Sequence, residues 1–171
     1  MAGLGRGRAI RVAGDDEGRM RPADLARVLA GLSDGPTIVC AQAGEVNTGA
    51  FDPFDAIADI VATRPRTWLH VDGAFGLWAA ATPSMRSYLR GHDRADSWAT
   101  DAHKWLNVPY DCGIAICAHP EMHAAAMEYA APYLTLADVD WAVEELEWAI
   151  DRGARMVVMR PAAPTTLTGR C

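Results

Sequence analysis

Lysine is almost absent from this chain. Among 171 residues there are 16 lysines and arginines together, and Lys104 is the only lysine among them. Positive charge is not concentrated anywhere, because the densest basic segment, the glycine-rich stretch 3–8, holds two arginines and the net charge is −6. An arm that binds nucleic acid or a membrane surface carries a denser basic run. We therefore expect no nucleic acid and no membrane among the partners.

Long apolar runs and closely paired cysteines are also missing. No stretch approaches the roughly 20 apolar residues of a membrane-spanning helix, and no apolar signal segment follows the N-terminus. The four cysteines contain no CxxC pair. Cys40 and Cys117 fall in strand-like runs, which predicts buried thiols in a reducing compartment. These features together predict a cytoplasmic protein.

The chain does contain a regular alternation of strand and helix patterns. Half of its residues are apolar and 22% are charged, as in globular domains. Short apolar or alternating runs predict strands at 8–12, 37–41, 68–71, 97–100 and 113–117, and helical spacing predicts helices at 20–32, 53–62 and 84–90. This order indicates an α/β fold with a largely parallel sheet. Ligands in such folds bind at the carboxyl ends of the strands.

The single lysine lies in an unusual setting. Lys104 follows an apolar-aromatic stretch and is flanked by His103 and Trp105, whereas surface lysines are normally surrounded by other charges. Upstream, Asp72 comes directly after the apolar run 68–71, where a buried strand ends. A lysine that bonds to an aldehyde and an acid that holds a pyridinium nitrogen are what a pyridoxal phosphate site requires. The alternative is a half-buried lysine paired with a carboxylate for packing.

Three sequence blocks resemble one known family. They are NTGAFDP at 47–53, HVDGAF at 70–75 and DAHKWL at 101–106, and they follow one another in the family's order. The interval from Asp72 to Lys104 is 104 − 72 = 32 residues, which is similar to the family's spacing. On these blocks, residues from about 6 to 133 resemble the middle of a group II pyridoxal-phosphate-dependent decarboxylase, the family of aromatic amino-acid and glutamate decarboxylases.

The resemblance implies a fold, a cofactor and four site residues. The fold is the three-layer, mostly parallel α/β large domain of the aspartate-aminotransferase-like class (fold type I), present here in incomplete form. Lys104 corresponds to the lysine that carries pyridoxal 5'-phosphate covalently, Asp72 to the acid at the ring nitrogen, Ala74 to the alanine against the ring face and His103 to the histidine near the phosphate. The family acts on amino acids and is typically homodimeric.

Some positions depart from the family pattern or have a second interpretation. The loop 43–48 (AGEVNT) replaces a threonine-rich loop, so Asn47 and Thr48 either contact the cofactor region or only shape the turn. Asp101 stands where an asparagine is common, and we assign it no cofactor role. His103 can equally be a core histidine bonded to a backbone carbonyl. A zinc site of four residues matches no metal motif, so no metal is predicted; its members would be His70, Asp72, His92 and His103.

Beyond about residue 134 the pattern changes. A helix over 138–153 and a strand over 154–159 weakly resemble part of a metal-dependent amidohydrolase barrel. We therefore divide the chain into a partial pyridoxal-phosphate-binding domain, 1–133, and a helix-strand tail of uncertain origin, 134–171. The resulting hypothesis is a truncated pyridoxal-phosphate-dependent amino-acid decarboxylase that is inactive alone. The alternatives are a non-catalytic remnant or interaction module, and another fold type I enzyme such as an aminotransferase or aldolase.

Overall fold

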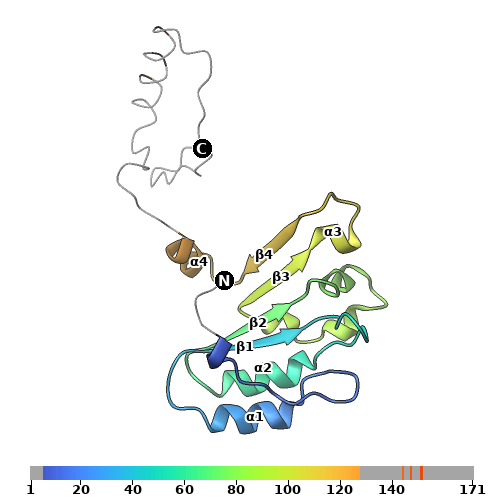
Figure 1. The fold of residues 1–171 in the computed structure, drawn as a ribbon, viewed down its shortest axis with the longest axis vertical. Coiled ribbons are helices and arrows are strands. Elements are labelled where there is room, and N and C mark those ends of the chain that lie inside the picture. Colours follow the sequence, from blue (N-terminus) through green and yellow to red (C-terminus); the bar gives the residue numbers. More distant parts are fainter. Residues whose placement is uncertain (1–5, 128–143, 145–146, 148–150, 152–171) are drawn as a thin grey trace. The chain divides into compact units, whose positions relative to one another are not determined.

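The computed structural model describes residues 6–127 and the single positions 144, 147 and 151. In this part of the chain one four-stranded sheet has the order β1-β2-β3-β4 (Figure 1). The strands are β1 (Thr37–Gln42), β2 (Thr67–Asp72), β3 (Ser97–Asp101) and β4 (Gly113–Cys117). β1, β2 and β3 are parallel, and β4 is antiparallel to β3. The predicted α/β fold with a mostly parallel sheet is confirmed.

Helices precede, connect and follow these strands. The α-helices are α1 (Pro22–Ala30), α2 (Phe54–Ala62), α3 (Ala102–Trp105) and α4 (Pro120–Met127). Short 3-10 helices occur at η1 (Arg6–Arg8), η2 (Leu77–Ala81), η3 (Arg86–Leu89) and η4 (His92–Arg94). The predicted helix over 84–90 is thus realised as the single 3-10 turn η3. The short helix α3 lies in the connection between β3 and β4, and it carries Lys104.

The core lies on one face of the sheet. Because side chains alternate along a strand, Val39 of β1 and Leu69 and Val71 of β2 point to the same side, where α1 and α2 lie (Figure 1). Leu25 from α1 and Ile57 from α2 are at most 1% exposed there. Within the described residues the fold therefore has two layers, and the second helical layer of the predicted three-layer arrangement is not among them.

Two local predictions are wrong. The predicted strand over 8–12 is not formed, although its pattern alternates. Residue 8 ends η1 and residues 9–12 find no strand partner among the described residues, and a lone strand leaves its backbone groups unpaired. Cys40 is exposed rather than buried, and Cys117 is only partly buried. Val39 and Ala41 occupy the core-facing positions of β1, so Cys40 between them points to the opposite face.

The tail predictions lie almost entirely outside the described residues. The boundary at 133/134 and the strand predicted over 154–159 lie wholly outside them. Of the helix predicted over 138–153, only positions 144, 147 and 151 are described, and each is helical. In the described part of the chain, no helix is long and apolar enough to cross a membrane.

Candidate functional site

The loop after β2 is fixed between the two neighbouring strands. Ala43 N–H donates to the Asp72 carbonyl at 2.7 Å, and Gly73 N–H donates to the Ala99 carbonyl at 2.8 Å. The buried Thr100 hydroxyl donates to the Gly73 carbonyl at 3.0 Å. A Cβ on Gly73 would lie 2.5 Å from that of Leu77, so only glycine fits this turn. The loop that follows Asp72 is consequently held at the carboxyl edge of the sheet.

Asp72 and Asp101 share this edge and the same sheet face. Asp72 pairs with Ala99 in the parallel register, and Asp101 is two residues further along β3. With ideal strand spacings their Cα atoms are about 8 Å apart. Both side chains point away from α1 and α2, because the alternate positions Val71 and Thr100 are buried on the helical side. The Asp72 carboxylate is exposed, and its Oδ1 accepts the Ala74 N–H at 3.1 Å.

Lys104 reaches the same region from α3. Its Nζ lies 2.7 Å from Asp101 Oδ2, and both side chains are about one-quarter exposed, at 27% and 26%. The same Nζ lies 3.9 Å from the centre of the Phe75 ring. Phe75 follows Ala74 in the loop after β2, so the lysine is close to the loop that contains Asp72. The arrangement contains the lysine–carboxylate pair that the packing alternative predicted.

The partnership of Lys104 also has an electrostatic effect. The hydrogen bond from the Lys104 ammonium, with further attraction from Lys104 and His103, lowers the pKa of Asp101 below its ordinary value despite partial desolvation. Trp78 Nε1–H donates to the Asp101 carbonyl at 3.3 Å and ties the end of β3 to η2. Sequence reasoning missed Asp101 and Phe75 as partners of Lys104. The three-residue spacing of Asp101 and Lys104 on a helical turn was the available signal.

His103 is bonded to the main chain. Its Nδ1 lies 3.1 Å from both the N and the O of Cys112, and its ring packs edge-on against Tyr110 with centroids 4.3 Å apart. This is the backbone-bonded histidine of the alternative interpretation, although the ring stays only partly buried. Which nitrogen carries the proton decides whether Nδ1 donates to the carbonyl or accepts the Cys112 N–H.

The loop 43–48 owes its shape to Glu45. The Glu45 carboxylate accepts the backbone N–H of Asn47 at 2.7 Å, that of Thr48 at 2.8 Å and the Asn47 side-chain amide at 2.7 Å. The Thr48 N–H contributes most to lowering the pKa of Glu45. Asn47 and Thr48 therefore shape the turn in this structure.

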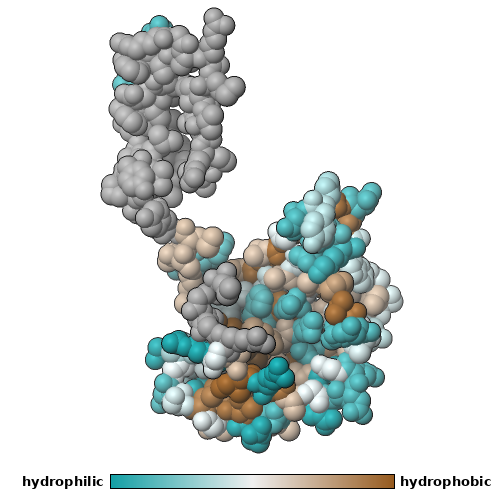
Figure 2. Space-filling view, viewed as in Figure 1, coloured by the Kyte–Doolittle hydropathy of each residue, from teal (hydrophilic) through white to brown (hydrophobic). Residues whose placement is uncertain are grey.

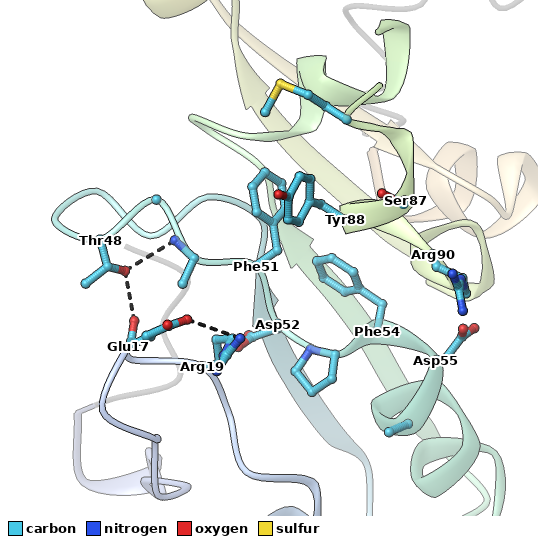
Figure 3. A pocket seen from close by; sticks show the side chains of 15 residues that line it. Glu17, Arg19, Thr48, Phe51, Asp52, Phe54, Asp55, Ser87, Tyr88 and Arg90 are labelled. Atoms are coloured by element: carbon cyan, nitrogen blue, oxygen red, sulfur yellow. Dashed lines mark hydrogen bonds and ion pairs between the residues drawn. The ribbon is translucent and has the colours of Figure 1, made fainter. Parts of the chain in front are cut away.

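A cavity of about 710 Å³ lies apart from Lys104 and Asp72 (Figure 3). It opens between the loop before α2, the start of α2 and η3. Its wall includes Phe51 stacked on Tyr88, with ring centroids 5.5 Å apart. Arg90 and Asp55 lie at one end of it (Figure 3). Sequence reasoning assigned no role to these residues.

The residues of the rejected zinc site have separate partners. His70 Nδ1 is bonded to the Ser97 hydroxyl at 2.8 Å, and His92 Nδ1 to the Leu89 carbonyl. His103 binds the Cys112 backbone and Asp72 the Ala74 N–H. Within residues 6–127, no three His, Cys, Asp or Glu side chains are arranged to hold a metal ion.

A family model and the sequences of known proteins both match this chain, and they agree with one another. Residues 2–161 match the family model described as the pyridoxal-dependent decarboxylase conserved domain. The chain is 42% identical to the cysteine sulfinic acid decarboxylase of Mus musculus over 113 residues, which is 64% of this chain and 23% of that protein. It is 33% identical to a tryptophan decarboxylase of Camptotheca acuminata over 127 residues, or 73% of this chain and 25% of that protein.

Solved structures show the same likeness. The glutamate decarboxylase domain of a diaminobutyrate-pyruvate transaminase and L-2,4-diaminobutyrate decarboxylase from Vibrio parahaemolyticus superposes with a TM-score of 0.64 at 31% identity. The match covers 74% of this chain and 28% of that one. The chain thus spans about a quarter of the length of the relatives it matches.

Proposed function

Because this chain belongs to the pyridoxal-dependent decarboxylase family, we propose that it binds pyridoxal 5'-phosphate covalently through Lys104. The observation that supports this most directly is the position of the Lys104 amine at the carboxyl edge of the sheet, over the Phe75 ring in the loop that begins at Asp72. Ligands of parallel α/β sheets bind at this edge.

The residues at this edge fit the cofactor chemically. A primary amine, a carboxylate with one oxygen free of the Ala74 N–H, and a small alanine side chain are what the aldehyde, the ring nitrogen and the ring face require. When bound, pyridoxal phosphate supplies an electron-accepting ring that stabilises the charge left when a bond to an amino-acid Cα breaks.

Each residue has a separate part in this proposal. Lys104 binds the cofactor, Asp72 keeps a proton at the ring nitrogen, and Ala74 leaves room for the ring. His103 is proposed to lie near the phosphate, with its Nε2 directed there while Nδ1 is bonded to Cys112. Asp101 and Phe75 contact the Lys104 amine.

The substrate class is proposed to be an amino acid that loses its carboxylate. The relatives are named for an aromatic substrate, tryptophan, and for an acidic one, cysteine sulfinic acid, so they do not select between these side chains. We further propose a cytoplasmic location and a homodimeric state, as for the family. A non-catalytic remnant that no longer binds the cofactor is the competing function.

Covalent labelling tests the proposal. Incubation with pyridoxal phosphate followed by borohydride should attach a reduced pyridoxyl group to the peptide that contains Lys104, as detected by mass spectrometry. Lys104→Ala should lose the label, whereas Asp72→Asn should keep it, because the amine is unchanged. Since Lys104 is the only lysine, the N-terminal amine is the internal control for non-specific reaction. Label on the N-terminus alone would support the non-catalytic alternative.

A further inference from the structure

Two independent contacts involve the Lys104 amine. The Asp101 carboxylate lies 2.7 Å from Nζ, and the face of the Phe75 ring lies 3.9 Å from it. A carboxylate and the negative face of an aromatic ring both attract an ammonium group and gain little from a neutral amine. Attack on an aldehyde, by contrast, requires the neutral amine.

Asp101 does not cap α3 with its side chain, although its position at the start of this helix would allow it. It is the N-cap residue of α3, where a carboxylate commonly accepts a backbone N–H from the first turn. Its side chain makes no such capping bond and is directed to the Lys104 ammonium instead. Asp101 therefore has two alternative sets of partners: the Lys104 side chain, or the N–H groups of the helix that carries Lys104.

We propose that Asp101 is a positioning residue that holds the Lys104 amine in an ion pair at the sheet edge and thereby limits the rate of covalent cofactor attachment. This inference rests on the proposed function and adds to it a control on the same lysine. Attachment requires the Lys104–Asp101 pair to break. The freed carboxylate then becomes available to cap α3, which offsets part of the cost of breaking the pair.

The chemical step requires the Lys104 ammonium to give up a proton. The Lys104 ammonium gives one proton to solvent or to Asp101, and the neutral nitrogen then bonds to the aldehyde carbon. The carbon–oxygen double bond breaks, and the oxygen leaves as water after taking up protons from the nitrogen and the solvent. Borohydride delivers hydride to the carbon of the resulting carbon–nitrogen double bond, which makes the attachment permanent.

Few titratable groups other than Asp101 lie near α3. His103 belongs to this helix, Cys112 and Tyr110 are beside it, and the His103 Nδ1 is already bonded to the Cys112 backbone. On the side of β2, the titratable group is Asp72, the last residue of that strand, which is unchanged in every variant below. The neighbouring Asp111 lies in the connection to β4.

The test compares labelling rates in four proteins. Asp101→Asn keeps the shape of the side chain and removes its charge. Asp101→Glu keeps the charge. Asp59→Asn is the matched control, since Asp59 of α2 forms an exposed ion pair with Arg94 of η4 and the change removes one carboxylate from that pair. At neutral pH we expect borohydride-trapped label on Lys104 to form about two- to fivefold faster in Asp101→Asn, the range that a partly exposed ion pair supports.

The two other variants separate charge from shape. Asp101→Glu keeps the carboxylate and Asp59→Asn leaves the Lys104–Asp101 pair intact, so both should label at the wild-type rate.

The outcomes separate the two proposals. Equal labelling rates of Lys104 in wild type and Asp101→Asn would overturn the role of Asp101 and leave the proposed function standing. Failure to label Lys104 in all four proteins would overturn the proposed function.

Discussion

Phe75 contacts Lys104, the proposed cofactor lysine, without a hydrogen bond or an ion pair. Its ring face lies 3.9 Å from Lys104 Nζ, and it belongs to the loop that starts at Asp72. The contact therefore links α3 to the loop after β2 and sets where the amine lies when it is charged. Cation–π contacts at accessible sites contribute about 0.5–1 kcal/mol, comparable to a surface ion pair.

We predict that Phe75→Leu accelerates covalent labelling of Lys104 by about two- to fivefold, because it removes the attraction between the ring and the ammonium. Phe75→Tyr keeps an aromatic ring and should label at the wild-type rate. The measurement is the same borohydride-trapped label, followed over time by mass spectrometry. A slower rate in Phe75→Leu would mean that the ring mainly positions the amine for attack.

Asp52 joins three elements at the scale of secondary structure. It lies just before α2, its Oδ1 accepts the Met20 N–H at 2.6 Å and its Oδ2 accepts the Gln42 N–H at 2.7 Å. The side chain therefore connects the segment before α1 to the end of β1. It is 8% exposed, and desolvation raises the pKa of Asp52 above its ordinary value despite these two hydrogen bonds.

We predict that Asp52→Asn lowers the free energy of unfolding by about 1–3 kcal/mol, measured by urea denaturation. An asparagine places an NH₂ group against one of the two backbone N–H donors, so a buried donor loses its acceptor. Asp59→Asn, in an exposed pair with Arg94, should change stability by less than about 0.5 kcal/mol. Equal stability of the two variants would show that Asp52 is not a structural link.

The pH dependence of wild-type stability follows from the same group. Because the pKa of Asp52 is raised on folding, the folded chain binds its proton more tightly than the unfolded chain. The contribution of Asp52 to the free energy of unfolding is therefore complete at pH values below the pKa of Asp52 in the unfolded chain. It decreases as the pH rises through the pKa of Asp52 in the folded chain. Asp52→Asn should lack this decrease.

At the scale of the whole molecule, the sheet is covered by helices on one face only within residues 6–127. On the other face Cys40 is exposed and His70 is partly exposed. Ile114 and Ile116 of β4 pair with Thr100 and Trp98, on the face that carries α1 and α2, and they are still 36% and 45% exposed. Hydrophilic and hydrophobic residues are intermixed on the surface shown in Figure 2. Among the described residues, Ala74 is the side chain proposed to lie against one face of the cofactor ring. No described residue is assigned to the opposite face.

We predict that the purified 171-residue chain releases little or no CO₂ from a panel of amino acids, even when Lys104 carries the cofactor. Decarboxylation needs the bond that breaks to be held in one orientation, and loose positioning alone costs about a hundredfold in rate. The assay is CO₂ release under saturating pyridoxal phosphate. Robust release that disappears in Lys104→Ala would contradict the prediction.

Much of the fold could be predicted from the sequence, because it depends on local patterns, and the same patterns placed the candidate site residues Asp72 and Lys104 near strand ends. Apolar runs and helical spacing located β1 to β4, α1 and α2, and Asp72 ended its strand as predicted. The three blocks identified the family, since they preserve both residue type and spacing. The alternating segment 8–12 failed because a strand needs a neighbour, and periodicity does not supply one.

Only the tertiary structure decided which groups meet. The antiparallel direction of β4, the outward face of Cys40 and the contact of Lys104 with Phe75 depend on how distant segments pack. The sequence by itself determined that one lysine follows a carboxylate at three residues' spacing. The structure decided that this carboxylate binds the lysine rather than capping α3, because the side chain takes the partner that three-dimensional proximity and charge favour.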